Sequence, residues 1–213
     1  MRLLFTYLAC VFLGGMSVNV FAQDKVIFED DFNHSKKFEK NWFDNSTEEK
    51  TGKIEYKKKG GIDNSGCVKI SNPERGAIRI MHSLNNLEPG KLYRMSAMMK
   101  CVGVKEGRGA VIYLNPDGLE QGWNASKFVY DDMEWSEIYM DFVPNQKGEA
   151  TICCALGFPW GTYNGGKALG EVYYDNVRVE PIGDKLYHRE SKHFIVSLDK
   201  DKVTITDKQM DRW

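Results

Sequence analysis

Two segments of the chain combine aromatic residues with polar and turn-forming residues. They are "YLNPDGLEQGWN" (113–124) and "GFPWGTYNGG" (157–166). Sugar rings present apolar C–H faces that stack on Trp and Tyr, whereas their hydroxyl groups need polar partners such as Arg, Asn, Gln or Asp. Gly and Pro flank these aromatic residues, as they do in loops, where binding residues concentrate. We therefore predict carbohydrate contacts for six residues: Arg79, Tyr113, Trp123, Trp160, Tyr163 and Asn164.

The placement of three of these residues leaves alternatives open. Tyr113 lies on the face away from the core if its neighbour Ile112 points inward, because successive strand residues point to opposite faces. Arg79 either reaches the same surface or is only solvated. Trp160 is either a platform for a sugar ring or is packed down against its own segment.

No catalytic motif is recognisable in the sequence. It contains neither H-E-x-x-H nor G-x-S-x-G. The adjacent acids Asp30-Asp31 and Asp131-Asp132 point in opposite directions on an extended chain, so neither pair can flank one glycosidic bond. The sequence therefore predicts a chain without a catalytic site.

A periodicity of two recurs along the chain and predicts β-strands. The clearest segments are 67–71, 77–84, 92–102, 110–114, 136–143, 150–158 and 171–179. Gly, Pro, Asn and Asp are frequent between them, as turns require. In 92–102 apolar residues alternate with more polar ones, which predicts one core face and one mostly wet face. No convincing helical stripe precedes residue 182, so we expect an all-β fold, an antiparallel sandwich or barrel.

The order of these segments resembles the galactose-binding-like jelly roll, in particular the carbohydrate-binding modules appended to xylanases and glucanases. The resemblance is carried by "FEDDFN…NWF", "LEPGKLYRMSAMMK", "EWSEIYMDFVP" and "GEVYYDNVRVEP", and it covers roughly residues 26–181. It implies an antiparallel β-sandwich of the jelly-roll type that binds a polysaccharide or oligosaccharide and has no catalytic role. It also places Trp42 and Trp135 at positions that are usually core.

The same resemblance implies a structural calcium ion and offers a reason for the acid within the apolar strand "VYYDNVRV" (172–179). Asp175 would bind calcium together with the first strand, where Glu29 and Asp31 alternate onto one face. The ion would then clamp the two ends of the sandwich. The sequence departs from the family at Asn33, where a glutamate is common. The alternative is that Asp175 begins a bulge or accepts hydrogen bonds from backbone amides.

The N-terminal segment predicts export. Residues 1–22 combine a positive start, an apolar run and a small-residue site at Val20-Phe21-Ala22, as in a cleavable signal peptide, with a lipoprotein anchor at Cys10 as the alternative. No later stretch is long and apolar enough for a membrane span. The formal net charge of −1 provides no basic footprint for nucleic acid. We therefore expect a secreted or periplasmic bacterial protein that is monomeric and has no nucleic-acid partner.

Four cysteines follow the signal segment: Cys67, Cys101, Cys153 and Cys154. None forms a C-x-x-C pair, which argues against a zinc site or a thioredoxin-like motif. All four lie in apolar strand-like segments, so we expect buried free thiols, with one disulfide as the alternative.

The sequence divides into three parts: a signal peptide (1–22), a β-sandwich domain (24–181) and a tail (182–213). The tail is charged, offers a strand in "HFIVSL" (193–198), and has a capping-box pattern at 206–209 that predicts the start of a helix. It resembles the first strand and helix of a following domain, so we expect the chain to be a fragment of a longer secreted protein.

Two other functions fit the same sequence. The chain could be the leading accessory domain of a secreted hydrolase, either a glycosidase or a metallopeptidase, whose catalytic domain is absent. It could also be an adhesive sandwich that binds a protein instead of a glycan.

Overall fold

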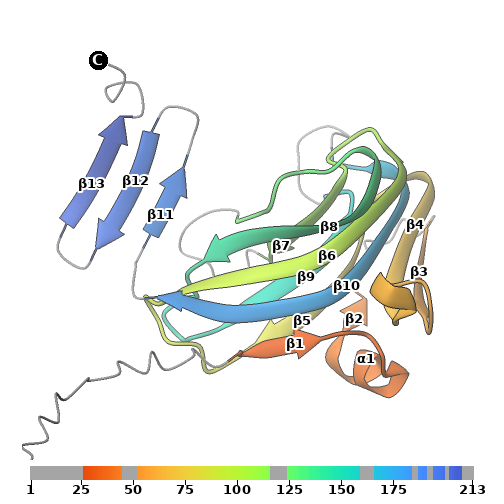
Figure 1. The fold of residues 1–213 in the computed structure, drawn as a ribbon, viewed down its shortest axis with the longest axis horizontal. Coiled ribbons are helices and arrows are strands. Elements are labelled where there is room, and N and C mark those ends of the chain that lie inside the picture. Colours follow the sequence, from red (N-terminus) through yellow and green to blue (C-terminus); the bar gives the residue numbers. More distant parts are fainter. Residues whose placement is uncertain are drawn as a thin grey trace, which may run out of the picture.

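The computed structural model describes residues 26–44, 52–115, 124–158 and 166–183, together with the backbone of three later strands. Two antiparallel sheets pack on each other around one core (Figure 1). The six-stranded sheet consists of β1 (Phe28–Asp30), β3 (Lys53–Lys57), β4 (Cys67–Gly76), β6 (Leu92–Lys105), β8 (Asp131–Phe142) and β10 (Ala168–Gly183). The four-stranded sheet consists of β2 (Phe43–Asp44), β5 (Ile78–Leu84), β7 (Ala110–Leu114) and β9 (Ala150–Leu156). The predicted antiparallel β-sandwich is confirmed.

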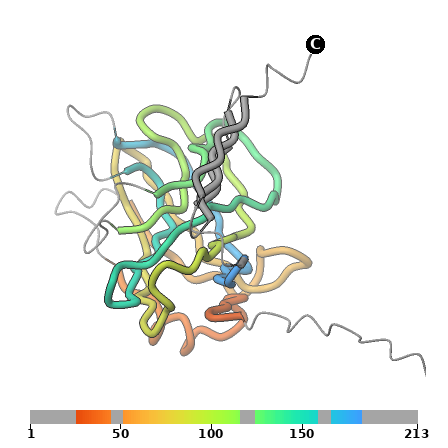
Figure 2. Tube along the Cα trace, turned by 90° about the vertical axis from the view of Figure 1, so that its left-hand side faces the viewer, coloured from red at the N-terminus to blue at the C-terminus, as the bar shows by residue number. Residues whose placement is uncertain are grey.

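Strand β10 organises the six-stranded sheet, whose order is β3-β4-β10-β6-β8. One edge of β10 pairs with β6 along most of its length. The other edge pairs with β4 over 168–174 and with β1 over 177–179. Figure 2 shows the red N-terminal segment beside the blue end of β10. The first and last strands of the sandwich therefore meet directly.

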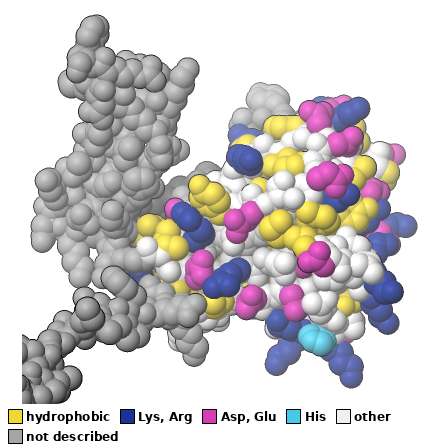
Figure 3. All heavy atoms as spheres, in the orientation of Figure 1, with side chains coloured by type: hydrophobic (Ala, Val, Ile, Leu, Met, Phe, Trp, Pro, Cys, Tyr) yellow, Lys and Arg dark blue, Asp and Glu magenta, His cyan; other side chains and the backbone are white. Residues whose placement is uncertain are grey.

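The core lies between the sheets and is built from alternate residues of both. In the six-stranded sheet, the predicted alternation of β6 is confirmed, because Tyr93, Met95, Ala97, Met99 and Cys101 are buried while the residues between them are partly exposed. The outward face of this sheet mixes acidic, basic and apolar side chains (Figure 3). In contrast, every residue of β7 is buried, and most residues of β9 are buried as well. Such strands are covered on both faces.

Tyr174 links the two sheets through its hydroxyl group. The residue belongs to β10, and its Oη lies 2.7 Å from the carbonyl oxygen of Ala155 on β9 and 3.0 Å from that of Val111 on β7. Burial raises the pKa of Tyr174 well above its usual value, so the hydroxyl stays a neutral donor.

The four cysteines in the described part of the chain, Cys67, Cys101, Cys153 and Cys154, are buried free thiols, as predicted. Cys154 faces the main core and Cys153 faces a second apolar cluster on the other side of the same sheet, as expected for neighbours on one strand. Burial is also the main reason why the pKa of Cys67 rises to about 11 and that of Cys101 to about 12. At neutral pH these groups therefore behave as small hydrophobic side chains.

Several local elements differ from the sequence prediction, among them the strands β2 and β3, which no predicted segment covers. A short helix, α1 (Ser35–Asn41), and a 3-10 turn, η1 (Ile62–Asn64), precede residue 182, where no helix was predicted. Neither has a buried residue, so neither could leave an apolar helical stripe in the sequence. Strand β4 also continues through the predicted turn at 72–76.

The tail forms a separate antiparallel sheet of β11 (Tyr187–Glu190), β12 (Phe194–Asp199) and β13 (Lys202–Asp207). The strand predicted at 193–198 is confirmed, whereas β11 and β13 were not predicted. The capping-box residues Thr206 and Asp207 end β13, and the predicted helix beyond them lies outside the described residues. Within the described part of the chain, no helix is long and apolar enough to cross a membrane.

Candidate functional site

The outer face of the four-stranded sheet carries a row of apolar and aromatic side chains in register. Phe43 on β2 lies opposite Met81 on β5, which lies opposite Cys153 on β9. Cys153 in turn lies opposite Tyr113 on β7, and a further bridge joins Tyr113 to Ala125. Residues directly opposite each other share a face, so the row crosses the whole sheet from an exposed edge to a covered one.

Polar groups flank this row on both sides. On one side, Arg79 on β5 lies opposite Ala155 on β9. On the other side, Ser83 lies opposite Thr151, and the backbone N–H of Asn115 donates to the Thr151 carbonyl at 2.8 Å. Ser83 is exposed and Thr151 is half-buried. The groups of this face that reach the solvent are Phe43 and Ser83, with Thr151 half-buried, whereas Met81, Cys153 and Tyr113 are buried. An exposed ring near hydroxyl groups suits a ligand that has both apolar faces and hydroxyls.

Of the two alternatives for Arg79, the structure shows the one that brings it to the same face as Tyr113, but below the surface. A terminal guanidinium nitrogen of Arg79 donates to the Tyr113 hydroxyl at 3.0 Å. Arg79 is 6% exposed and Tyr113 is fully buried, and burial raises the pKa of Tyr113. The two side chains therefore form the floor of the outer face, and the Tyr113 ring is not itself an open stacking platform.

The segment 124–129 covers the free edge of β7. Leu114 N–H donates to Asn124 O, Ser126 N–H donates to Ile112 O, and Ala110 and Val129 exchange two hydrogen bonds, each 2.9 Å long. This pairing explains why β7, an edge strand of its sheet, has no exposed residue.

Aromatic side chains gather where this segment meets the end of β9. The Phe158 ring centroid lies 4.9 Å from that of Tyr113 and 5.9 Å from that of Phe128. The exposed Arg108 guanidinium lies over both phenylalanine rings, at 5.3 and 5.5 Å from their centroids. Phe158, Tyr113 and Met81 belong to the second apolar cluster, which is distinct from the main core.

The four remaining predicted contact residues, Trp123, Trp160, Tyr163 and Asn164, lie outside the described residues. The positions that flank their segments are described. One segment starts after Asn115 and returns at Asn124, whereas the other starts after Phe158 and returns at Gly166, whose carbonyl accepts the Phe158 N–H at 2.7 Å. Because Leu114 pairs with Ile152 and Ala110 with Leu156, these anchors lie at opposite ends of β7. The carbohydrate contacts of Trp123, Trp160, Tyr163 and Asn164 therefore stay predictions.

Phe43 was missed by sequence reasoning. This residue is 44% exposed at the edge of the outer face, next to the buried Trp42. Trp42 was predicted to be core and is confirmed as such, with its indole N–H donating to Asp30 at 3.0 Å. Alternation then directs the next residue outward, which is the signal that could have identified Phe43. The same core prediction was wrong for Trp135, which is half-buried on β8 and outside the core cluster.

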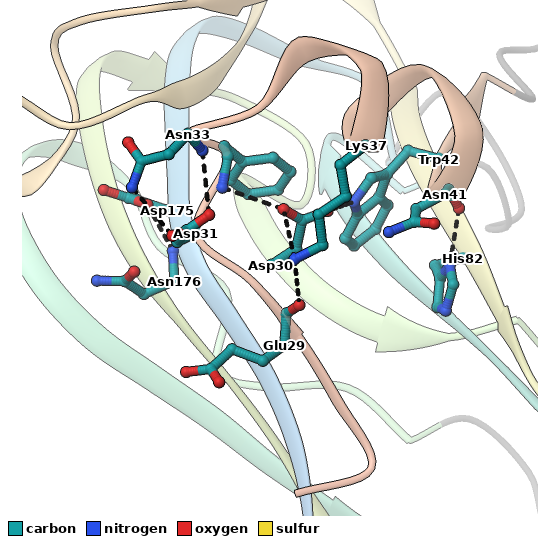
Figure 4. Close-up of polar contacts among 11 residues, drawn as sticks. Glu29, Asp30, Asp31, Asn33, Lys37, Asn41, Trp42, His82, Asp175 and Asn176 are labelled. Carbon is teal, nitrogen blue, oxygen red and sulfur yellow. Dashed lines mark hydrogen bonds and ion pairs between the residues drawn. The ribbon is translucent and has the colours of Figure 1, made fainter.

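The acids predicted to bind calcium take different positions. Glu29 is exposed and lies opposite Arg178, and its carboxylate points away from Asp175 in Figure 4. Asp31 is half-buried, and its pKa is lowered chiefly because the backbone N–H of Asn33 donates to it. Asp175 is fully buried. No three His, Cys, Asp or Glu side chains among the described residues are grouped so that they could hold a metal ion.

The acid of β1 that faces inward is Asp30, not Glu29 or Asp31. Its carboxylate accepts from the Trp42 indole and from the Phe32 N–H at 3.1 Å, and the Lys37 ammonium lies 3.5 Å away. Figure 4 shows these groups together beside His82, whose Nδ1 lies 2.7 Å from the Asn41 carbonyl oxygen. The predicted shared face of Glu29 and Asp31 is therefore the outward face of β1. Calcium itself stays a prediction.

Comparisons with known proteins extend only to the fold. No family model and no curated protein matches the chain. Among solved structures 88 chains match. The family 22 xylan-binding domain of Paenibacillus barcinonensis Xyn10C aligns with 75% of this chain and 96% of its own length, at 8% identity and a TM-score of 0.50. The described chain therefore has the β-sandwich fold of carbohydrate-binding modules.

Two other matches belong to much longer proteins. The enzymatically active domain of bacteriophage CBA120 tailspike protein 4 aligns with 70% of this chain, at 16% identity and a TM-score of 0.48. A Clostridium thermocellum xylanase fragment, in complex with xylohexaose, aligns with 74% at 15% identity and a TM-score of 0.49. The chain spans only 21% and 29% of these two structures, respectively.

Proposed function

We propose that this chain is an exported, non-catalytic carbohydrate-binding module that docks a polysaccharide or oligosaccharide on the outer face of its four-stranded sheet. The observation that carries the proposal is the exposed Phe43 at the edge of this face, with the Ser83 and Thr151 hydroxyls on the same face and the buried Arg79–Tyr113 pair as its floor. The β-sandwich fold is compatible with this function but does not decide it.

The chemistry of the face suits a sugar chain. An exposed phenyl ring offers an apolar plane for the C–H face of a pyranose, and hydroxyl groups next to it can donate to or accept from sugar hydroxyls. Arg79 is already held by Tyr113, so little ordering of its side chain is needed on binding. The predicted loop residues Trp123, Trp160, Tyr163 and Asn164 would extend the contact area at both ends of this face.

Calorimetric titration of the purified chain with xylo-, manno- and galacto-oligosaccharides tests the proposal. We expect binding to at least one of the three and a loss of affinity of roughly tenfold in Phe43→Ala, which corresponds to about 1.4 kcal/mol. Tyr139→Ala is the matched control, since Tyr139 is 55% exposed on the outer face of the other sheet. Its affinity should equal that of the wild type.

Two results would contradict the proposal. Absence of binding to all three series would favour the adhesive, protein-binding alternative. Equal losses in the two variants would show that the sugar does not select the four-stranded sheet. Export belongs to the proposal as well, and the mass of the secreted protein should correspond to cleavage after Ala22.

A further inference from the structure

The last strand of the sandwich changes its neighbour at Asp175. On one edge of β10, the pairing with β4 ends at Tyr174 and the pairing with β1 begins at Val177. The register of β10 against β6 also shifts after Asp175, and Asn176 has a left-handed backbone with φ of 47°. This is a β-bulge at the junction of three strands, and such a break leaves backbone N–H groups in need of acceptors.

Asp175 supplies acceptors at this junction with both of its carboxylate oxygens. Oδ2 accepts from the Ile62 N–H at 2.9 Å and from the Ser65 hydroxyl at 2.7 Å. Oδ1 accepts from the Asn176 N–H at 2.7 Å. The alternative drawn from the sequence, a bulge with bonds to backbone amides, is therefore confirmed. The acid binds the segment 61–66 to the last strand.

Asn33 fixes the same segment to the start of the sandwich. Its Oδ1 accepts from the Gly66 N–H at 2.9 Å, while its own Nδ2 donates to Asp31 at 3.0 Å. Gly66 is packed so closely on the Phe32 carbonyl group that a Cβ atom would collide with it. Segment 61–66 thus contacts residues that follow β1 on one side and Asp175 of β10 on the other.

We propose that this network of amides and carboxylates closes the two ends of the sandwich without calcium. Calcium prefers carboxylate and carbonyl oxygens as ligands. Here Asn33 directs an amide NH₂ group at Asp31, Glu29 lies outward, and the Asp175 oxygens already accept three hydrogen bonds. An ion that took Asp175 as a ligand would have to compete with these donors. The residues present therefore do not fit the calcium site that the family resemblance implies.

Metal content and thermal unfolding test this inference independently of sugar binding. Native mass spectrometry of the purified chain should find no bound calcium. The melting temperature should be the same in millimolar calcium chloride and in EDTA. One calcium ion per chain, or a melting temperature that rises with calcium, would overturn the inference.

Three single substitutions separate the network from a metal site. Ser65→Ala removes one donor to Asp175 and should lower the melting temperature by roughly 3–8 °C, equally with and without calcium. Ser136→Ala is the matched control, because this exposed serine bonds only locally to the Glu134 carbonyl, and Glu29→Gln should also match the wild type. A wild-type melting temperature for Ser65→Ala, or a calcium-dependent loss in Glu29→Gln, would contradict the network.

Discussion

Each outer face of the sandwich carries an arginine–tyrosine pair, and the two pairs are built differently. On the four-stranded sheet, Arg79 donates to the hydroxyl of Tyr113, and both side chains are buried. On the six-stranded sheet, the Arg94 guanidinium stacks 4.3 Å from the Tyr139 ring centroid and forms two hydrogen bonds, of 2.7 and 2.9 Å, with Asp141. The first pair lies below the surface of its sheet, whereas the second pair lies on a solvated face.

The difference shows how to distinguish a ligand-binding face from a face that is only solvated. The six-stranded sheet neutralises its outer charges locally, through pairs such as Lys69–Glu171 and Arg94–Asp141. The Lys69 ammonium is the main reason why the pKa of Glu171 is lowered, and the Asp141 carboxylate likewise raises that of Arg94. The four-stranded sheet instead buries its arginine and most of its apolar row, and it exposes Phe43 and Ser83 on the same face. We infer that only the latter has the composition of a ligand surface.

Removing the two tyrosines should produce the largest contrast. Tyr113→Ala leaves a cavity among buried side chains and removes one hydrogen-bond acceptor from Arg79, so we expect a loss of about 3–5 kcal/mol in the free energy of unfolding. Tyr139→Ala should cost about 1 kcal/mol or less, because the residue is 55% exposed and leaves no buried cavity. Urea unfolding of the two variants measures the contrast. Equal losses would mean that the outer face of the four-stranded sheet is not a second packed layer.

Replacing the two arginines should also destabilise the four-stranded sheet more than the six-stranded one, but the difference in the free energy of unfolding should be smaller than for the tyrosines. Arg79→Ala leaves the buried Tyr113 hydroxyl without this donor and should cost about 1–3 kcal/mol. Arg94→Ala breaks a partly exposed ion pair and should cost about 1 kcal/mol or less. A double-mutant cycle for each arginine–tyrosine pair sharpens the test. The coupling energy should be larger for the buried pair, and the reverse order would break the comparison.

The pH dependence of stability should come from neither arginine–tyrosine pair but from His82, which lies on β5 of the four-stranded sheet. Burial lowers the pKa of His82 below its usual value, so the unfolded chain takes up the proton first. Stability should therefore fall as the pH drops below the unfolded-state pKa of 6.5, by at most about 1.4 kcal/mol per pH unit.

Urea unfolding between about pH 7.5 and pH 5.5 measures this fall, since histidine is the side chain that titrates in that range. The substitution His82→Asn should make the free energy of unfolding nearly independent of pH in this range. The difference between Tyr113→Ala and Tyr139→Ala should stay constant over the same range. A difference that changes with pH would mean that one of the outer faces titrates there.

The sequence predicted the strands well because their side-chain patterns have a direct physical cause. Alternation in β6 followed from one wet face, and the unbroken apolar runs "AVIYL" and "ATICCAL" correspond to strands covered on both faces. The short helix α1 left no pattern, because it buries none of its residues. Contacts that join distant segments, such as Ser65 with Asp175, have no local signature at all.

The candidate sites were less predictable because they depend on which face of a strand each side chain occupies and on whether other segments bury that face. In β1 the assumed face was one residue out of phase, which exchanged Asp30 for Glu29 and Asp31, since a shift of one residue reverses every side chain in a strand. The sequence left open whether Arg79 shares a face with Tyr113 or is only solvated, and the structure shows that both side chains are buried on the outer face of the four-stranded sheet. Phe43 was overlooked because its two-residue strand shows no alternation of its own, and only the core position of Trp42 indicates that the next residue faces outward.

Chemical-shift mapping with an oligosaccharide tests most directly the claim that the four-stranded sheet is the ligand surface. The probe is the oligosaccharide that the calorimetric panel identifies as the tightest ligand. We predict that the largest shifts fall on Phe43, Ser83, Thr151 and the segment 124–129, while Tyr139 and its neighbours on β6 and β8 stay unchanged. Shifts confined to β6, β8 and β10 would contradict the account.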